Sequence, residues 1–383
     1  MRFPEFTEEW EETTLGKISE ITKGSGISKD QLSEQGSPCI LYGELYTKYK
    51  SEIIDEVYSR TELDSSSLVK SKANDVIIPC SGETAIDIST ARCVPFNNIL
   101  LGGDLNIIRL KHDDGGFFAY QLNGARKKDI ARVAQGVSVV HLYGENLKHI
   151  RVYHPAIEEQ KKITRLLSLI DERIATQNKI IEDLKKLKSA IIEKEYTHKT
   201  KSNSHIGDFI EQTSKRNKNR AIQNVLSVSN RQGFIQQSEQ FENRSVASDD
   251  TSSYKIVKKN NFAFNPARIN VGSIARLTTF DRGIVSPMYI CFRTKDTLFP
   301  EYLDYYFETK QFFTEIQKRL EGSVRQCLSF EGLCNIPLCI PTIEVQQQVG
   351  KQLSTLVQEI KLEIDFLELL QRQKKFLLHQ MFI

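Results

Sequence analysis

Residues 136–163, GVSVVHLYGENLKHIRVYHPAIEEQKKI, return 186 positions later as residues 322–349, GSVRQCLSFEGLCNIPLCIPTIEVQQQV. The two stretches align without a gap. The matched pairs are Gly136 and Gly322, Leu142 and Leu328, Leu147 and Leu333, Ile150 and Ile336, Pro155 and Pro341, Glu158 and Glu344, and Gln160 and Gln346. A period this long indicates a duplicated domain rather than a solenoid. One binding module in each copy suits a ligand with two separated parts, of which duplex DNA is the commonest.

The length and composition are those of a soluble protein with two domains. The 383 residues are enough for two domains that each bury a core, and hydrophobic residues make up 39% of them. No apolar run is long enough for a membrane span, and the acidic opening MRFPEFTEEWEE is unlike a signal peptide. We therefore expect a cytoplasmic protein with no membrane partner. The seven cysteines form no C-x-x-C pair, which favours reduced thiols over disulfides or zinc ligands.

The charge differs between the two halves. Residues 1–136 contain 16 Lys and Arg against 21 Asp and Glu, a net −5, whereas residues 199–322 contain 19 against 13, a net +6. Five of the acids in the first half lie within the first twelve residues. DNA-binding domains are usually more basic than this, because Lys and Arg contacts to phosphate supply much of their affinity. Charge alone therefore does not indicate DNA.

A heptad seam follows the repeated stretch in each copy and predicts a long helix there. Its apolar positions alternate at intervals of four and three residues. In the first copy they are Ile163, Leu167, Ile170, Ile174, Ile181, Leu184 and Ile191; in the second they are Val349, Leu353, Leu356, Ile360, Leu367, Leu370 and Leu377. Polar residues interrupt both seams at matching places, Gln177 and Lys188 against Glu363 and Lys374. The prolines Pro155 and Pro341 fit the first turn of each helix.

Neither stripe can be buried by its own helix, so we expect the two helices to pack against each other as an antiparallel coiled coil. A symmetric register would place Gln177 beside Glu363 and penalise slipped alignments. Twenty-eight residue steps span about 42 Å, somewhat more than one turn of B-DNA at about 34 Å. The helices could therefore act as a ruler between two half-sites. They could equally be a coiled coil that only pairs the domains.

The regions between the repeats predict α+β domains. Short runs rich in β-branched and aromatic residues predict strands at 76–78, 106–110, 273–277 and 288–293. Helical patterns cover 116–128 and 300–320. A polar linker at 196–205 connects the first long helix to the second half.

Several motifs follow one another in a characteristic order. They are FPEFTEEWEETTLGKI at 3–18, YGELYTKY at 42–49, IIPCSGETAIDIS at 77–89, NPARINVGSIA at 265–275, and the IEEQKKI and IEVQQQV segments with their long helices. Their order resembles one family, the DNA-specificity subunits of type I restriction-modification systems. The resemblance covers essentially the whole chain. It implies target-recognition domains at 1–155 and 199–341, with coiled-coil segments at 156–198 and 342–383.

The resemblance also implies a function and partners. Each recognition domain would read one half of a bipartite, asymmetric sequence in double-stranded DNA. The helices would dock two methyltransferase subunits, which methylate adenine at N6, and motor-nuclease subunits would join the assembled complex. The chain itself would be noncatalytic and need no cofactor. A coiled-coil scaffold that bridges two protein partners without reading DNA remains the alternative.

Candidate DNA contacts in the first half combine aromatic, cationic and small residues. The first group is Tyr42, Tyr46, Lys48, Tyr49 and Lys50, for which a strand edge with surface lysines is the alternative. The second group is Ser81, Gly82 and Thr84, where a tight structural turn would look the same. Lys23 and Ser25 lie in a short glycine loop, KGSGISK, that could hold phosphate. Gln135 and Ser138 flank the glycine of the repeated segment.

In the second half, Arg268 and Asn270 are the strongest candidates for reading bases, because Arg pairs with guanine and Asn with adenine. Lys215, Arg216 and Lys218 form a basic run suited to phosphate, or a solvated loop. Arg325, close to Gly322, could contact the DNA backbone.

No catalytic signature appears in the sequence. There is no nucleotide-binding P-loop, no glycine-rich cofactor loop after a strand and no complete adenine-methylation motif; residues 265–268, NPAR, share only its first two letters. The seven histidines show no metal-ligand spacing. His141, His149 and His154 lie in the repeat, but Cys327, Asn335 and Ile340 replace them in the second copy. We therefore predict a chain that is not an enzyme and has no metal site.

Overall fold

The computed structural model describes residues 2–197, 204–230, 232–237, 250–322 and 326–382. The chain divides into two compact units, Met1–Lys179 with Ile364–Ile383, and Ile180–Glu363. Each unit therefore combines one variable region with part of both long helices, whereas the sequence placed each helix in a segment of its own.

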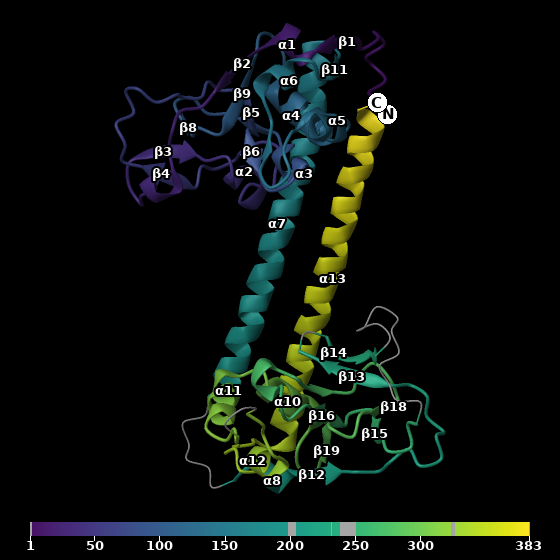
Figure 1. Cartoon of the computed structure of the whole chain (residues 1–383). Helices are drawn as coiled ribbons and strands as arrows, with labels where there is room; N and C mark the ends of the chain where they lie inside the picture. Colours follow the sequence, from purple (N-terminus) through teal and green to yellow (C-terminus); the bar gives the residue numbers. More distant parts are fainter. Residues whose placement is uncertain (1, 198–203, 231, 238–249, 323–325, 383) are drawn as a thin grey trace. The chain divides into compact units, whose positions relative to one another are not determined.

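The first unit is built on a four-stranded antiparallel sheet (Figure 1). Its order is β2 (Ser19–Lys23), β9 (Leu105–Leu110), β5 (Asp75–Pro79) and β7 (Arg92–Val94). The central strand β5 is buried on both faces. Alternate side chains of a strand point to opposite sides, so β5 contributes to two cores. Val76 and Ile78 join the core that contains α4 (Gly115–Asn123), while Ile77 joins a second core on the other face.

Smaller elements surround this sheet. A three-stranded sheet has the order β4 (Ser59–Thr61), β3 (Ser37–Ile40) and β8 (Leu100–Leu101), and two pairs are formed by β1 (Glu11–Thr14) with β11 (Arg151–His154) and β6 (Ser81–Gly82) with β10 (Val140–His141). The short helices are α1 (Leu15–Ile18), η1 (Lys29–Gln31), α2 (Glu44–Thr47), α3 (Ala85–Ile88), α5 (Lys127–Val133) and α6 (Gly144–Lys148).

The second unit repeats the main sheet in the same order. Here the strands are β12 (Ile210–Thr213), β19 (Ile290–Thr294), β16 (Phe262–Phe264) and β17 (Ile274–Arg276). Phe262, Phe264 and Phe292 take the sheet positions that aliphatic residues hold in the first unit, and the rings of Phe262 and Phe292 stack with centroids 5.1 Å apart. The two copies thus keep one scaffold and fill it with different side chains.

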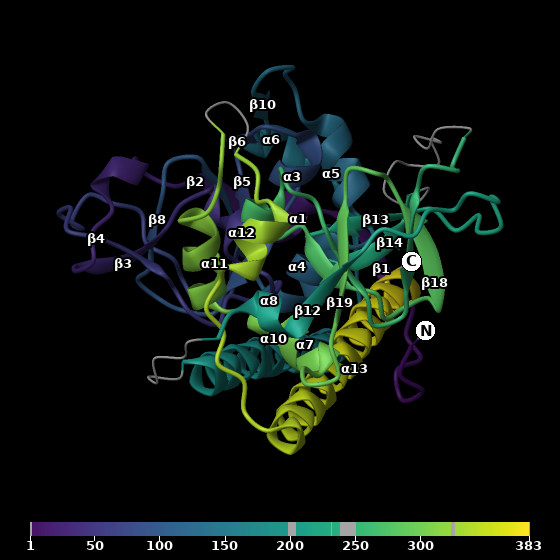
Figure 2. The same cartoon turned by 90° about the horizontal axis from the view of Figure 1, so that it is seen from below.

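Among its described residues, the second unit also contains two antiparallel strand pairs and five short helices. The pairs are β13 (Leu226–Ser229) with β14 (Gly233–Gln236), and β15 (Lys255–Lys258) with β18 (Arg282–Val285). The helices are α8 (Ile206–Phe209), η2 (Ile269–Val271), α10 (Pro300–Tyr306), α11 (Lys310–Gln317) and α12 (Phe330–Cys334). Figure 2 shows α8 beside β12, into which it leads.

The two long helices are α7 (Ile157–Tyr196) and α13 (Ile343–Met381). In the first unit, Leu377 and Met381 near the end of α13 share a core with Ile163 and Leu167 near the start of α7. The reverse holds in the second unit, where Ile192 and Tyr196 at the end of α7 share a core with Val349 and Leu353 at the start of α13. The predicted fold class, two α+β halves with two long antiparallel helices, is confirmed.

The seam positions are withdrawn from solvent. The buried ones are Ile163, Leu167, Ile170, Gln177, Ile181, Val349, Leu353, Leu356, Ile360, Leu370 and Leu377, and the half-buried ones are Ile174, Leu184, Ile191, Glu363 and Leu367. The pairing of Gln177 with Glu363 stays a prediction.

A buried glutamine fastens the start of each long helix to its own half. In the first copy Gln160 donates to the carbonyl of Pro155 (2.8 Å) and accepts from the backbone N–H of Asp114 (2.9 Å). In the second copy Gln346 donates to the carbonyl of Pro341 (2.9 Å) and accepts from the N–H of Phe299 (2.8 Å). The repeated glutamine is therefore a structural clasp between helix and domain.

Three details of the predicted secondary structure are wrong. The helix predicted at 116–128 is two helices, α4 and α5, separated at Gly124, and the one predicted at 300–320 divides into α10 and α11. The prolines lie two residues before the first helical residues Ile157 and Ile343, not in the first turn. The alternative of a strand edge at 42–50 is also wrong, because this segment contains the helical turn α2.

Candidate nucleic-acid interface

In both copies the same backbone pairing forms the base of a hairpin at the start of the repeated segment. The backbones of Gln135 and His141 exchange hydrogen bonds of 2.9 and 2.7 Å, and those of Glu321 and Cys327 exchange bonds of 2.9 and 2.8 Å. Gly136 and Gly322 have φ angles of +121° and +103°. A Cβ atom on Gly136 would lie 2.1 Å from the carbonyl oxygen of Val139. The matched glycines are therefore required by the turn.

Each hairpin is joined to the end of a central strand of its own sheet. The N–H of Leu142 donates to the carbonyl of Cys80 (2.7 Å), and the N–H of Leu328 donates to the carbonyl of Pro266 (3.1 Å). Cys80 and Pro266 are again 186 positions apart. By the same offset Gly82 corresponds to Arg268 and Thr84 to Asn270, and these residues follow equivalent anchor points. The local backbone differs, because Ser81–Gly82 forms β6 whereas Ile269–Val271 forms η2.

In the first copy this place carries small side chains. Val140 and His141 of the hairpin pair with Gly82 and Ser81. Ser81 is buried beneath the hairpin, so the prediction that its side chain contacts DNA is wrong. Thr84 is exposed, and its hydroxyl group accepts from the N–H of Asp87 (3.1 Å) at the start of α3.

In the second copy the same place carries long polar side chains. Arg268 and Asn270 are exposed on either side of Ile269, which is fully buried and anchors the turn η2. The buried Asn265 shapes this turn by accepting from the N–H of Ala267 (3.1 Å). The Arg268 side chain has no hydrogen bond or ion pair within the described residues. It is therefore free to bind a ligand.

The helical turn α2 lies next to the first-copy site. The hydroxyl of Tyr46 is 3.5 Å from the position a Cβ on Gly82 would take. The buried guanidinium of Arg92 fixes this segment by donating to the carbonyls of Leu45 (3.1 Å) and Tyr49 (2.9 Å). Burial lowers the pKa of Arg92, an effect that the nearby Glu52 partly opposes.

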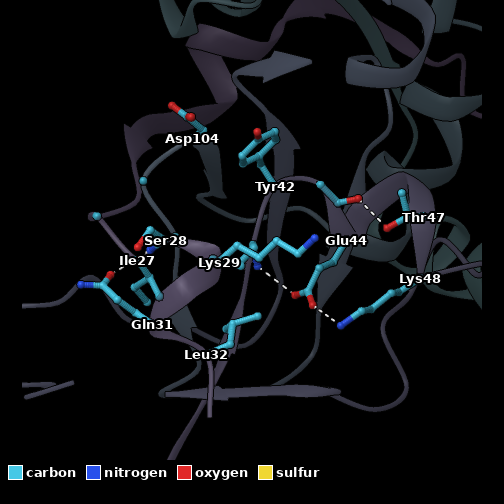
Figure 3. Close-up of a pocket in the computed structure, with 15 residues that line it drawn as sticks. Ile27, Ser28, Lys29, Gln31, Leu32, Tyr42, Glu44, Thr47, Lys48 and Asp104 are labelled. Atoms are coloured by element: carbon cyan, nitrogen blue, oxygen red, sulfur yellow. Dashed lines mark hydrogen bonds and ion pairs between the residues drawn. The ribbon is translucent and has the colours of Figure 1, made fainter. Parts of the chain in front are cut away.

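The other side of α2 lines a cavity of about 840 Å³ (Figure 3). Tyr42 and Lys29 extend into it, and Glu44 accepts hydrogen bonds at its floor from Lys48 (2.6 Å) and the N–H of Leu41 (3.0 Å). Because Glu44 and Asp104 also line the cavity, its cations are balanced by carboxylates.

Other first-half candidates are divided between core and surface. Tyr49 is buried against the ring of Tyr58, so the prediction that it contacts DNA is wrong. Ser25 uses its hydroxyl to accept from the N–H of Val69 (2.8 Å), which indicates a structural role. Six candidates, Lys23, Tyr46, Lys48, Lys50, Gln135 and Ser138, are exposed or half-buried.

The predicted basic run of the second half lines a cavity of about 800 Å³. Lys215, Arg216 and Lys218 are joined there by Arg282 from β18, a residue that the sequence analysis missed because it lies far along the chain. Within the described residues none of these four cations has a carboxylate partner. The loop is held by the buried Asn217, which donates to the carbonyl of Ile222 (2.9 Å). This arrangement suits an anion such as phosphate. Arg325 lies outside the described residues.

The two lysines that interrupt the heptad seams make equivalent contacts. In the first unit Lys374 forms ion pairs with Asp171 (2.6 Å) and Glu52, and its ammonium group lies 5.7 Å from the Tyr120 ring centroid. Its first-copy counterpart, Lys188, pairs with Glu308 (2.7 Å) in the second unit and lies 5.5 Å from the ring of Tyr305. Each long helix is therefore fixed by a lysine near its end.

Within the described residues, no three His, Cys, Asp or Glu side chains come together in a way that could hold a metal ion. The described helices also include none that is both long and apolar enough to cross a lipid bilayer.

Comparisons with known proteins agree with this architecture. Residues 7–186 match the family model for the type I restriction modification DNA specificity domain. Two relatives come from Methanocaldococcus jannaschii. The putative MjaX specificity subunit is 33% identical over 102 residues (25% of this chain, 24% of the relative), and the MjaVIII specificity subunit is 25% identical over 213 residues (53% and 47%). The chain thus aligns with about half or less of the length of these relatives.

Two solved structures share the fold over nearly the whole chain. The type I S subunit from M. genitalium has a TM-score of 0.62 at 16% identity, covering 98% of this chain and 96% of the other. A chain from a study of the assembly and conformational transition of the type I R-M system has a TM-score of 0.56 at 13% identity, with 97% of each covered. Fold and repeat define a two-copy protein with paired long helices. Residues 7–186, just under half of the chain, are thus similar to type I restriction modification DNA specificity domains.

Proposed function

We propose that this chain is the noncatalytic subunit that gives a type I restriction-modification complex its DNA sequence specificity. Each unit reads one half of a bipartite, asymmetric site in double-stranded DNA. The observation that carries the proposal is the equivalence of the two hairpin sites. Two residues beyond the matched anchor the chain bears Gly82 in one copy and Arg268 in the other, and four residues beyond it Thr84 and Asn270. A common scaffold with different exposed side chains is what the reading of two different half-sites requires.

The second copy has the clearer chemistry for reading bases. Arg268 can donate two hydrogen bonds to guanine, and Asn270 can exchange two with adenine. The cavity lined by Lys215, Arg216, Lys218 and Arg282 binds the DNA backbone and positions the unit without adding sequence information. Phosphate contacts and base contacts are therefore made by different parts of this unit.

Helix α13 provides a surface for protein partners. Leu362, Phe366, Leu369 and Phe376 are between 47% and 68% exposed and recur at intervals of four, three and seven residues along the helix. Such an apolar stripe favours docking of another protein. We propose that two methyltransferase subunits bind the long helices, that motor-nuclease subunits join the assembled complex, and that the complex acts in the cytoplasm.

Two substitutions in the assembled complex separate base reading from phosphate binding. Arg268→Ala should relax one position of the second half-site, at a cost of about 1–3 kcal/mol for the preferred base. Arg282→Ala should weaken binding to all sequences alike and reduce the slope of log K against log salt by about one. Binding titrations on duplexes with single-base changes, at several salt concentrations, measure both effects.

The same titrations test the scaffold alternative. A bridging scaffold would assemble with its partners, and the complex would show no loss of DNA affinity for either variant. Uniform weakening by Arg268→Ala would instead remove that residue from base reading.

A further inference from the structure

The tip of the first-copy hairpin exposes two valines. Val137 is 96% exposed and Val139 is 52% exposed, although β-branched apolar side chains are usually buried. Because almost all of its surface is in contact with solvent, Val137 contributes little to the fold. The hairpin is stabilised instead by backbone hydrogen bonds between Gln135 and His141 and between Leu142 and Cys80.

The glycine and leucine that frame the hairpin are identical in the two copies, but the sequence between them differs. Gly136 and Leu142 match Gly322 and Leu328, whereas 137–141 reads VSVVH and 323–327 reads SVRQC. Val137 and Val139 are exposed, so they are free to contact a ligand. Different residues at these positions are what contacts to two different half-sites require.

The shape of the hairpin suits a DNA groove. The major groove admits a two-stranded β-ribbon, and the hairpin is held against the strand end that carries Gly82 and Thr84. In that groove the C5 methyl group of thymine is the one apolar feature of the base edges. The side chain of valine is stiff at χ1, so little conformational freedom is lost when it makes such a contact.

We propose that Val137 enters the major groove of the first half-site and packs against a thymine methyl group. This inference rests on the proposed function and adds to it a specificity-determining residue. In the first unit, reading at this position is apolar, whereas the second unit reads through Arg268 and Asn270. Val137 thereby senses a methyl group rather than a hydrogen-bonding pattern.

The test removes the methyl group from the DNA and the valine from the protein. The assembled complex is titrated with duplexes of its own recognition sequence, in which each thymine of the first half-site is replaced in turn by deoxyuridine. At one position the wild-type complex should lose about fourfold in affinity, the factor expected for one buried methyl group. The Val137→Ser complex should bind the thymine and uracil duplexes equally well.

The control variant is Val345→Ser, which changes another exposed valine, on α13, and should keep the fourfold response. The inference is overturned if no thymine in the first half-site responds, or if Val137→Ser responds to uracil as the wild type does. It is also overturned if Val137→Ser weakens only the association with the methyltransferase. If the complex still binds its own recognition sequence in preference to others, these outcomes overturn only the role of Val137. A complex that binds all DNA sequences equally would contradict the proposed function itself.

Discussion

At the scale of single residues, the repeat marks positions that hold the fold. Gln160 and Gln346 were visible in the sequence only as a matched pair. In the structure each is a buried amide that donates to the carbonyl of a proline. Gln160 also accepts from the N–H of Asp114 and donates to the side-chain carboxylate of Asp113. Gln346 accepts from the N–H of Phe299 and donates to the carbonyl of Thr297. The sequence showed that this glutamine occurs in both copies, but only the structure shows which groups it bonds.

Gln346→Leu should destabilise the second unit by about 2–4 kcal/mol, because the N–H of Phe299 and two carbonyls would lose their partner in a buried place. Gln347→Leu, at an exposed neighbouring position, should change the free energy of unfolding by less than about 0.5 kcal/mol. Urea unfolding measures both. Equal effects of the two variants would show that the clasp contributes nothing.

Buried thiols predict a loss of stability in alkali. Burial raises the pKa of Cys39 and of Cys80 from about 9 to about 11. Below pH 9 both thiols are protonated in the folded and unfolded chain; above it the unfolded chain releases protons first. The stability they contribute is therefore lost as the pH rises from about 9 to about 11.

Urea unfolding between pH 8 and 11 checks this prediction. The wild type should lose more stability across this range than the Cys39→Ala, Cys80→Ala double variant. Parallel pH profiles would contradict it.

At the scale of elements, the heptad pattern predicted the long helices well because a stripe of matched apolar residues depends only on helical periodicity. The shorter helices were predicted less well. Gly124 separates α4 from α5, and Thr309 begins α11 by accepting from the N–H of Phe312 (3.1 Å). Such local capping bonds compete with continuous helix and are not visible in a pattern of apolar residues.

The candidate site was likewise predicted only in part from the sequence. The sequence identified Arg268, Asn270, Gly82 and Thr84, but not that they are equivalent, because the equivalence depends on hydrogen bonds to the hairpin. It misassigned Tyr49 and Ser81, since an aromatic or hydroxyl side chain in a polar motif gives no sign of its burial. Arg282 was missed because the other cations of the cavity, Lys215, Arg216 and Lys218, are more than sixty residues away in the sequence.

The seam lysines should differ in their contribution to stability. Lys374→Met leaves Glu52 and Asp171, whose side chains are 9% and 8% exposed, without their cation, and should cost about 3–5 kcal/mol. Lys188→Met affects only Glu308, which is 47% exposed, and should cost about 1 kcal/mol or less. Thermal unfolding of the two variants measures the difference. A larger loss for Lys188→Met would contradict it.

At the scale of the whole molecule, we propose that the length of the two helices sets the spacing of the half-sites. One heptad inserted into both α7 and α13 adds about 10 Å of helix, equivalent to about three base pairs of B-DNA. The gap in the recognition sequence should lengthen by about that amount, with both half-sites unchanged. Mapping of methylated adenines in cells that contain the variant complex measures the gap. A gap that keeps its original length would contradict the ruler.

The central claim is that each copy reads one half-site. Its most direct test replaces residues 1–135 with the corresponding region of another family member and maps methylated adenines genome-wide. The account predicts a new first half-site, with the second half-site and the gap unchanged. An unchanged sequence, a change in both halves or one uninterrupted recognition sequence would contradict it.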